Sequence, residues 1–373
     1  MTQPKDHFSR RDFLKLAGLG LGALALRPFV PLEEALDRAA AGGLLRLPDF
    51  PQAERLARNC VGRIPIKARP DVNSATVEDI YEDAVLPWLR EVVAETLDIN
   101  HYRQRWVETP RGYIYSTYLQ PCRNLPNVPL TALTAGSNGF WAEVTVPYAD
   151  CYLENDPASP YLKYLTAGGF PIRVYYSQVF WVDQIRTTDS GVVLYRVSER
   201  YGSYGDVLWA EGAAFRPISE ADIAPITPEI DTAEKRVVVN LNRQTLSCFE
   251  QGREVYFCRV STGVGDNSTP VGEFATWRKT ISIHMAGGTV DAGYDTPGIA
   301  WTTLFHGQGV AIHATFWHNQ FGEKRSHGCV NCLPEDAKWI WRWTAPVVPL
   351  EPGDVTWDNW QTGSTHVIVE ERY

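Results

Sequence analysis

Two residues in the C-terminal third of the chain, Cys329 and His313, are of the types needed for nucleophilic catalysis. A thiol attacks only as a thiolate, and the pKa of a free cysteine is about 8.5, so a neighbouring base or cation must assist it. Histidine is the usual partner in such a pair. The two residues are 16 positions apart, too far for one helix face or one hairpin turn. The fold must therefore bring His313 back to Cys329.

The residues next to this pair suit the same chemistry. Residues 309–313, Gly-Val-Ala-Ile-His, predict a short buried strand, which is a rigid support for a base. Gly328 precedes the cysteine and, lacking a Cβ, lets the backbone approach a substrate carbonyl closely. The N–H groups of Gly328 and Cys329 are then candidates for an oxyanion hole in acyl transfer.

The order of these residues also resembles a known signature. His313, a gap, and the run Ser326-His327-Gly328-Cys329-Val330-Asn331 resemble the motif of the L,D-transpeptidase family, whose catalytic domain is of the YkuD type. The likeness covers roughly residues 234–373 and includes residues 294–297, where the family has a substrate-covering segment. Twelve residues separate His313 from Ser326, slightly fewer than is usual in the family, which predicts a shorter loop beside the site.

The resemblance implies a role for each residue of the motif. Cys329 is the expected nucleophile and His313 the expected base, with the imidazole oriented by the carbonyl of Ala314. Gly328 and Cys329 supply the oxyanion-binding amides. Ser326 and His327 are expected to shape the loop rather than transfer protons. The candidate substrate-binding residues are Tyr294, Ser326, His327 and Asn331.

The expected reaction follows from the same resemblance. The chain is predicted to be an exported cysteine acyltransferase of cell-wall biogenesis that needs no metal or organic cofactor. Its donor would be a peptidoglycan stem peptide whose third residue, a diamino acid, is bonded to a terminal D-amino acid. Transfer to an amine of a second stem gives a 3→3 cross-link, and carbapenem-type inhibitors are expected to acylate the thiol. The alternatives are an L,D-carboxypeptidase, with water as acceptor, and a non-catalytic wall-binding protein.

Three other interpretations of these residues compete with nucleophilic catalysis. A lone cysteine is often a small buried hydrophobic residue. Cys329 and Cys332 also form a Cys-x-x-Cys pattern, but no thioredoxin-like βαβ pattern surrounds it. A zinc site would lack the standard paired ligand spacings; it would draw on the two cysteines and on His306, His313, His318 and His327. The full motif with its flanking matches favours catalysis over all three.

The N-terminus predicts export. Residues 9–15, Ser-Arg-Arg-Asp-Phe-Leu-Lys, resemble the twin-arginine signal, and eleven apolar residues follow at 16–26. Such a segment is too short to span a bilayer and fits a signal sequence. We therefore expect the twin-arginine export machinery as a partner and a periplasmic or cell-wall location, with the segment either cleaved or retained as an anchor. Residues 1–45 are assigned to signal and linker, with a short helix possible at 33–41.

The rest of the chain is predicted to be mainly β. Residues 60–122 resemble bacterial SH3-like domains, with strands at 76–81 and 85–92 and a hairpin at 106–115. Residues 139–218 form a second β module, possibly SH3-like, and 219–233 a semi-extended linker. Residues 234–373 are expected to be a β-sandwich catalytic domain with a short helix at 334–341, after the cysteine. Gln251-Gly252 predicts a tight hairpin turn.

Composition and cysteine content limit the partners and the cross-links. The chain has 373 residues, enough for two or three domains, and a formal net charge of −9. With no basic stripe to neutralise phosphates, nucleic acid is not expected as a partner. Among seven cysteines, Cys60 and Cys122 bracket the first module and are a candidate disulfide if their Cα atoms lie within about 7 Å. Cys248 and Cys258 lie on adjacent predicted strands but out of register.

Overall fold

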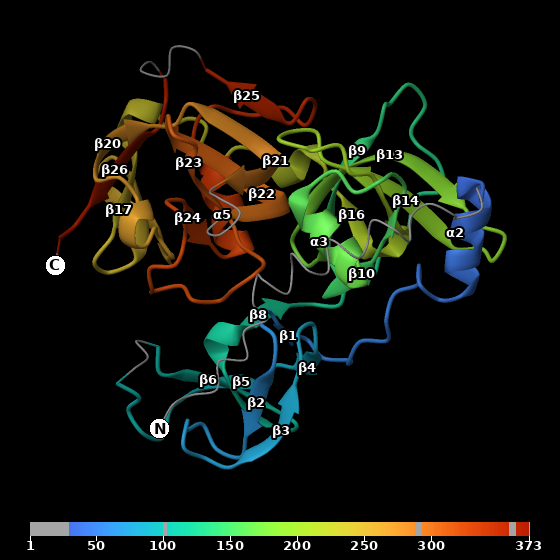
Figure 1. Ribbon diagram of the computed structural model, residues 1–373. Coiled ribbons are helices and arrows are strands. Elements are labelled where there is room, and N and C mark those ends of the chain that lie inside the picture. Colours follow the sequence, from blue (N-terminus) through green and yellow to red (C-terminus); the bar gives the residue numbers. More distant parts are fainter. Residues whose placement is uncertain (1–29, 100–102, 288–292, 358–362, 373) are drawn as a thin grey trace.

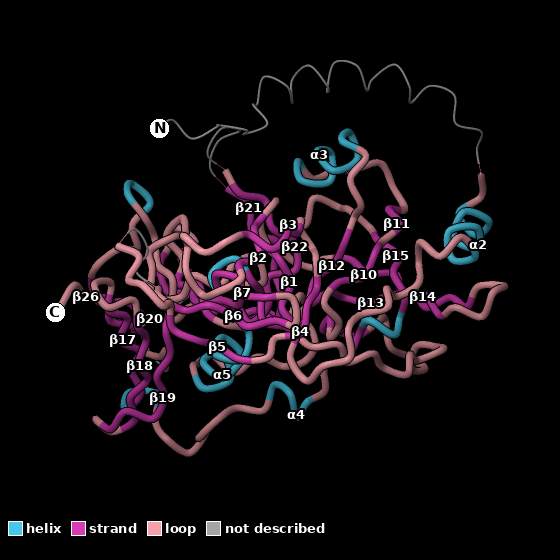
Figure 2. The backbone as a smooth tube through the Cα atoms, turned by 90° about the horizontal axis from the view of Figure 1, so that it is seen from below, coloured by secondary structure: helices cyan, strands magenta, loops and turns pink. Residues whose placement is uncertain are grey.

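The computed structural model describes residues 30–99, 103–287, 293–357 and 363–372. The twin-arginine segment and most of the predicted signal lie outside these residues. The chain is mainly β, as predicted, and folds into three units in sequence order (Figure 1). The first unit lies beneath the junction of the other two, and α2, α3 and α4 lie outside the strand layers (Figure 2). In the described part of the chain, no helix combines the length and the apolar character needed to cross a membrane.

The first unit is a small two-sheet β structure with strand orders β4-β1-β8 and β3-β2-β7-β6-β5. Its hydrophobic core includes Ile66, Val107 and Ile114, all fully buried. The predicted strand at 85–92 is in fact two strands, which are separated around Trp88. The first strand of the unit precedes residue 60, where the module was predicted to begin. Its elements are β1 (Leu56–Asn59), β2 (Ile64–Lys67), β3 (Thr76–Ile80), β4 (Val85–Pro87), β5 (Arg90–Val93), β6 (Arg105–Thr109), β7 (Gly112–Tyr115), the 3-10 turn Ser116–Tyr118 and β8 (Leu119–Cys122).

The second unit is built on a six-stranded sheet with the order β11-β15-β14-β13-β9-β16 and a β10-β12 pair. Helix α2 (Leu32–Ala41) packs on this sheet through Leu36 and Ala40, so residues that we assigned to the signal and linker belong to the folded structure. The second unit also contains a helix that we did not predict, α3. The elements are β9 (Phe140–Val144), β10 (Tyr148–Asp150), β11 (Tyr152–Leu153), α3 (Pro160–Gly168), β12 (Arg173–Tyr175), β13 (Val179–Thr187), β14 (Val193–Ser198), β15 (Leu208–Glu211), the 3-10 turn Gly212–Ala214 and β16 (Phe215–Pro217).

The third unit consists of two five-stranded sheets with helix α5 packed among their buried faces. The first sheet has the order β19-β18-β17-β26-β20 and the second β24-β23-β22-β21-β25. Gln251 and Gly252 both have positive φ, 50° and 81°, as the predicted tight turn requires. The elements are β17 (Lys235–Asn240), β18 (Thr245–Glu250), β19 (Arg253–Arg259), the 3-10 turn Gly265–Asn267, β20 (Gly272–Ala275), β21 (Arg278–Gly287), β22 (Tyr294–His306), β23 (Val310–Ala314), β24 (Val330–Cys332), α5 (Pro334–Trp343), β25 (Asp354–Thr356) and β26 (His366–Glu370).

The segment expected to be a semi-extended linker is instead packed against the third unit. It contains a short helix, α4 (Glu220–Ile223), and the 3-10 turn Thr232–Glu234. Ile223 is 5% exposed and belongs to the same core as α5. Asp222 pairs with Arg216 behind it and with Lys338 of α5, at 2.9 Å in each case. These contacts fix the entry into the third unit.

The expected Cys60–Cys122 disulfide is absent: both cysteines are free thiols. The ends of the first unit do lie side by side, because β1 pairs antiparallel with β8. Leu56, however, is the residue opposite Cys122, while the N–H of Cys60 bonds the carbonyl of Tyr118. The two thiols are therefore at opposite ends of the ladder. Cys248 and Cys258 are also free and out of register, as predicted.

Candidate active site

The fold brings the histidine and the cysteine together through one parallel strand pair. β23 and β24 are aligned with Ile312 opposite Val330 and His313 opposite Asn331. Cys329 precedes β24 and continues this register opposite Ala311. Because residues two apart share one face of a strand, Cys329 and His313 lie on the same face. Both line a cavity of about 480 Å³.

His313 is fixed in one tautomer. The imidazole is buried, at 2% exposure, and its Nδ1 lies 2.9 Å from the carbonyl oxygen of Ala314. Nδ1 must carry the proton to donate to a carbonyl, so Nε2 is left as the acceptor. Burial lowers the pKa of His313 to about 4, against a smaller opposing effect of the Ala314 hydrogen bond. A neutral imidazole with a free Nε2 is the form that accepts a thiol proton.

Cys329 is a neutral thiol in this state. Burial raises its pKa to about 11. Its Sγ lies 3.8 Å from the carbonyl oxygen of Gly309. Together with the low pKa of His313, this favours a neutral thiol beside a neutral imidazole at neutral pH. In such a pair a thiol proton can move to the imidazole as a substrate is attacked, which is general-base catalysis.

The turn before the cysteine is held by its own hydrogen bonds. Gly328 has a φ of 116°, a conformation that favours glycine. Its N–H donates to Ser326 Oγ at 3.2 Å, and its carbonyl accepts from Thr269 Oγ1 at 2.7 Å. The hydroxyl of Ser326 also donates to the carbonyl of Cys329. The Gly328 amide must give up its bond to serve an oxyanion, which leaves the Cys329 amide as the better-placed candidate of the two.

The remaining residues predicted to bind substrate lie at the same cavity in different roles. Tyr294 and His327 pack with ring centroids 5.1 Å apart at its edge. Asn331 lines the cavity, but it is 3% exposed and its side-chain nitrogen lies 2.9 Å from Nε2 of His318. Asn331 therefore braces the loop that follows β23. The Cys-x-x-Cys pattern does not form a redox pair, because Cys332 lies in the hydrophobic core and Cys329 in the cavity.

Sequence reasoning missed four residues of the cavity. Trp317 is the most informative, since its ring stacks on His313 with centroids 5.9 Å apart and planes 30° apart. Trp317 follows His313 by only four residues, and this closeness in sequence was a usable signal that its side chain lies near the base. The others come from the β21–β22 hairpin and from the end of the loop; the four are Met285, Ile299, Trp317 and Arg325, while Asp295 and Thr296 lie in the predicted substrate-covering segment 294–297.

The second unit contributes to this site by holding the β21–β22 hairpin. The Oδ2 of Asp295 accepts from the N–H of Tyr161 at 2.8 Å. Gln178 Nε2 donates to the carbonyl of Pro297 at 2.7 Å. A second cavity of about 130 Å³ lies at this junction and shares Asp295, Thr296 and Trp317 with the first. The active-site cavity thus extends toward the second unit.

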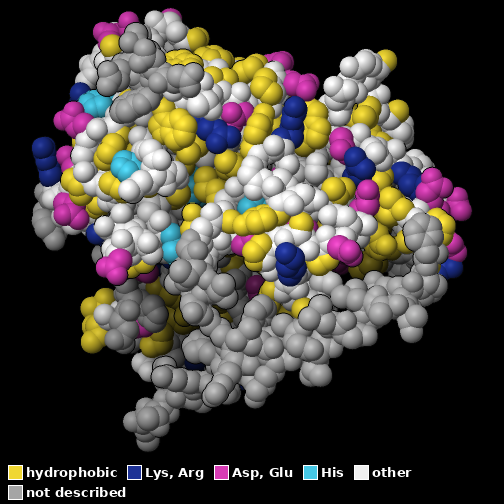
Figure 3. All heavy atoms as spheres, turned by 45° about the horizontal axis from the view of Figure 1, so that its top comes forward, with side chains coloured by type: hydrophobic (Ala, Val, Ile, Leu, Met, Phe, Trp, Pro, Cys, Tyr) yellow, Lys and Arg dark blue, Asp and Glu magenta, His cyan; other side chains and the backbone are white. Residues whose placement is uncertain are grey.

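Charge on the face shown in Figure 3 is mixed rather than concentrated. On the face shown in Figure 3, acidic and basic side chains alternate among hydrophobic ones. In the described residues, no group of three or more His, Cys, Asp or Glu is arranged to hold a metal ion.

A partly exposed cysteine beside a buried histidine, at the edge of a β-sandwich, is an arrangement that thiol acyl transfer can use. Residues 234–369 match the family model of the YkuD L,D-transpeptidase catalytic domain. Over these residues the chain is similar to the L,D-transpeptidase catalytic domain. No curated protein matches the chain.

Several solved structures are similar to the chain, all at low identity. A mutant Enterococcus faecium L,D-transpeptidase is 22% identical, with 38% of this chain and 51% of that chain covered and a TM-score of 0.30. An L,D-transpeptidase from Mycobacterium smegmatis is 16% identical, with coverages of 51% and 99% and a TM-score of 0.30. The E. faecium catalytic domain acylated by ertapenem is 22% identical, with coverages of 37% and 97% and a TM-score of 0.28. The chain spans about half the length of the first structures it matches, 50% and 51%.

Proposed function

We propose that the protein is a cysteine-dependent L,D-transpeptidase that forms an acyl-enzyme on a peptidoglycan stem peptide. The observation that carries this proposal is the pairing of β23 with β24, which puts Cys329 and His313 on one face of one cavity. The family match over residues 234–369 supports the same chemistry. Carbapenems are proposed as acylating inhibitors, since a related catalytic domain was solved acylated by ertapenem.

The acylation step follows from the protonation states at rest. His313 Nε2 takes the proton of the Cys329 thiol as Sγ attacks the carbonyl carbon of the L-centre of the diamino acid. The N–H of Cys329 donates to the oxyanion that forms. The amide C–N bond then breaks, and His313 returns the proton to the departing amino group of the terminal D-amino acid. A thioester on Cys329 remains.

The second half of the reaction reverses these roles. An amine from a second stem attacks the thioester, and His313 accepts its proton. The Cys329 Sγ leaves as thiolate, takes the proton back from His313, and the new amide is a 3→3 cross-link. Tyr294 and Trp317 stand at the cavity edge and over the base, where they limit access of water. With water as acceptor, the same steps make the protein an L,D-carboxypeptidase.

Two incubations of the purified protein test this proposal. Imipenem should add its mass to the wild type at Cys329, and Cys329→Ala should show neither labelling nor turnover while remaining folded, because both nucleophile and thioester are lost. A disaccharide tetrapeptide should give a cross-linked dimer. Tripeptide alone would mean hydrolysis, and neither labelling nor product would leave a non-catalytic wall-binding protein. Release of D-alanine by Cys329→Ala would overturn the nucleophile assignment.

We also propose that the protein works outside the cytoplasm after twin-arginine export, with the first two units as SH3-like modules at the cell wall. Support comes from Arg10 and Arg11 in the N-terminal motif and from the strand-rich architecture of both units. Replacing both arginines by lysine should leave the precursor inside the cell. Export of the double variant at the wild-type level would contradict the proposed route.

A further inference from the structure

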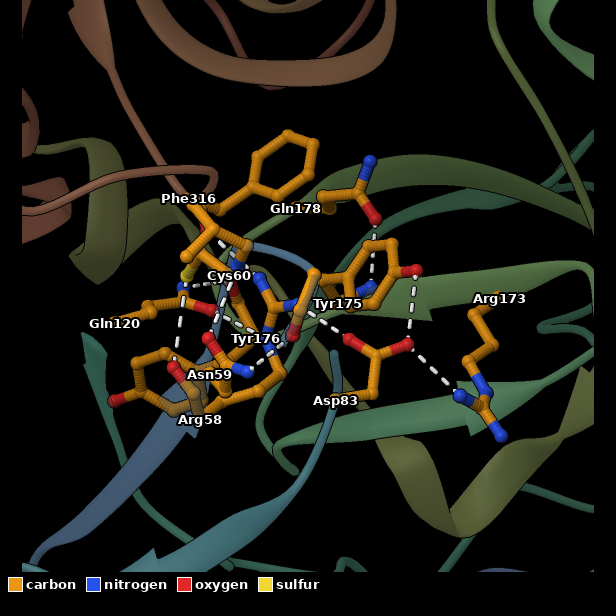
Figure 4. Close-up of polar contacts among 12 residues, drawn as sticks. Arg58, Asn59, Cys60, Asp83, Gln120, Arg173, Tyr175, Tyr176, Gln178 and Phe316 are labelled. Carbon is orange, nitrogen blue, oxygen red and sulfur yellow. Dashed lines mark hydrogen bonds and ion pairs between the residues drawn. The ribbon is translucent and has the colours of Figure 1, made fainter. Parts of the chain in front are cut away.

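A buried arginine of the first unit reaches the loop beside the catalytic base. Arg58 on β1 is 3% exposed, and its guanidinium is bonded on three sides (Figure 4). Nε donates to Gln120 at 2.9 Å and Nη1 to Asp83 at 2.6 Å, both within the first unit. Nη2 donates to the carbonyl of Phe316 at 2.8 Å, 258 positions away in the loop between β23 and β24. One side chain thus ties the first unit to the active-site loop.

The second unit joins the same network. The other oxygen of Asp83 accepts from Arg173 of β12 at 2.8 Å, so one carboxylate bridges two arginines from different units (Figure 4). Asp83 has a positive φ of 65°, an unusual backbone conformation for a residue other than glycine. The ring of Tyr175, also on β12, lies 4.1 Å from the guanidinium of Arg58 and stacks on the ring of Phe316 at 5.8 Å. All three units meet at Phe316.

From Phe316 a continuous series of ring contacts leads to the base. The ring of Phe316 packs edge-on against Trp317 with centroids 5.0 Å apart. Trp317 stacks on His313 at 5.9 Å. The carbonyl held by Arg58 and the indole that covers His313 therefore belong to adjacent residues. A displacement of this carbonyl moves the covering indole as well.

The first unit holds the loop at further points. The side-chain nitrogen of Asn319 donates to the carbonyl of Ser116 at 3.0 Å, and its backbone N–H to that of Thr117 at 3.4 Å. The N–H of Arg103 donates to Glu323 at 3.2 Å. The loop is thus bound to the first unit from its beginning, at Phe316, to its middle, at Glu323.

We propose that Arg58 is a positioning residue of this site, which fixes Phe316 and thereby holds Trp317 over His313. The proposal rests on the proposed acyl-transfer function and adds to it that the first unit is a structural part of the active site, not only a spacer or wall-binding module. Without the guanidinium, the loop loses its hydrogen bond at the carbonyl of Phe316, and Trp317 no longer keeps water from the base.

This geometry makes a prediction about pH. Burial holds the pKa of His313 at about 4, so exposure to water should raise it toward its ordinary value of about 6.5. The acid limb of the acylation profile, where His313 becomes protonated, should then move upward. The titratable and charged groups that share the cavity with His313 are Cys329 just before β24, Tyr294 and Asp295 on β22, and Arg325 and His327 on the loop, with His318 close by. None of these is removed by a change at Arg58.

The test measures the rate of Cys329 acylation by imipenem from pH 5 to 9, by intact mass, in the full chain. Arg58→Met should acylate about 10- to 100-fold more slowly at neutral pH, the loss expected for a small misplacement of catalytic groups. Its acid limb should shift upward, and Arg58→Lys should recover part of the rate. Arg63→Met is the matched control, since Arg63 is exposed and pairs only within the first unit, with Asp79, and should behave as the wild type.

Two further measurements keep the outcome decisive. If Arg58→Met fails to fold, Asn319→Ala removes a milder anchor of the same loop and should show the same two changes at smaller size. Alkylation of Cys329 by iodoacetamide needs no substrate recognition, and should be faster in the variants because the wall opens. A folded Arg58→Met with wild-type rate, limb and alkylation would overturn the proposal. A wild type that imipenem does not label would count against the proposed function alone, with alkylation still deciding the role of Arg58.

Discussion

The two walls of the active-site cavity are held by different chemistry. The loop after β23 is bound to the first unit through Arg58, whose guanidinium stays protonated at any accessible pH. The β21–β22 hairpin is bound to the second unit through His284, which lies between two carboxylates. Its Nδ1 is 2.6 Å from Glu199 of the second unit, and its Nε2 contacts Asp295 of the hairpin itself. One wall is therefore anchored by a permanent charge and the other by a titratable one.

The difference gives the two walls different responses to pH. Burial alone would lower the pKa of His284, but the hydrogen bonds and charges of Glu199 and Asp295 outweigh it and raise the pKa. A raised pKa means that the stabilisation is fully present below the ordinary value of about 6.5 and is lost as pH rises through the folded-state value. A neutral imidazole has a single N–H and serves only one of the two carboxylates. The hairpin should loosen at alkaline pH while the loop stays in place.

The largest effect is expected where the two walls meet, at the base. His313→Gln should slow acylation by imipenem roughly 10²- to 10⁴-fold, the usual contribution of a general base. Raising the pH toward the Cys329 pKa of about 11 should restore part of the rate, because the thiolate then forms without help. Stopped-flow or mass-based rates from pH 6 to 10 measure this.

A His313→Gln protein as fast as the wild type at neutral pH would remove His313 from the mechanism. The two walls would then surround a different base, and the comparison between them would lose its catalytic meaning. His327, at the edge of the same cavity, would be the next residue to replace.

A smaller and pH-dependent effect is expected at the hairpin. His284→Gln should acylate about 3- to 10-fold more slowly than the wild type at pH 6. A tenfold change corresponds to the interaction free energy of a pKa shift of about one unit. As the pH rises through the folded-state pKa of His284, the wild type itself loses the imidazolium, so the two rates should converge toward pH 9. Hydrogen exchange of β21 and β22 at the two pH values should follow the same pattern.

His306→Gln is the control for this change, because His306 ends β22 away from Glu199 and Asp295. The groups that face His284 from the second unit are Glu199 and the ring of Tyr204, at 5.1 Å, with Asp206 near Glu199. An equal deficit of His284→Gln at both pH values would show that shape, not titration, holds the hairpin.

The centre of the site was predictable from sequence, and its walls were not. The motif around Cys329 predicted that Cys329 and His313 share one site, and both do line one cavity, while their roles as nucleophile and base stay predictions. Arg58 carries no such mark, because its partner is a backbone carbonyl 258 positions away that any residue type supplies. A buried contact of this kind between two units depends on how the whole units pack, which no local sequence pattern records.

Some of the fold was missed although its signals were present. Ser159 is the N-cap of helix α3, and its side chain accepts from the N–H of Leu162. Pro160 stands in the first turn of the helix. It ends at Gly169 in the left-handed conformation, a common helix stop. These caps indicate a helix, but its weak apolar periodicity within a strand-rich region concealed it. The Cys60–Cys122 prediction was wrong for a different reason, because closeness of two chain ends does not fix the register of the strands that carry them.

The smallest effect is expected at a neutral contact between the β21–β22 hairpin and the second unit. Ser282 lies on β21 two residues before His284, and its hydroxyl donates to the carbonyl of Val179 on β13 at 2.6 Å. Ser282→Ala removes one uncharged hydrogen bond, so unfolding in denaturant should become easier by about 0.5–1.5 kcal/mol. Acylation should change less than about twofold, a free-energy difference of about 0.4 kcal/mol, with no pH dependence, because nothing that titrates has been altered.

If Ser282→Ala reproduced the loss of His284→Gln at pH 6 and its recovery at pH 9, any loosening between β21 and β13 would suffice to produce that behaviour. The contrast between a permanent and a titratable anchor would then fail, and the two walls would differ only in how tightly they are packed.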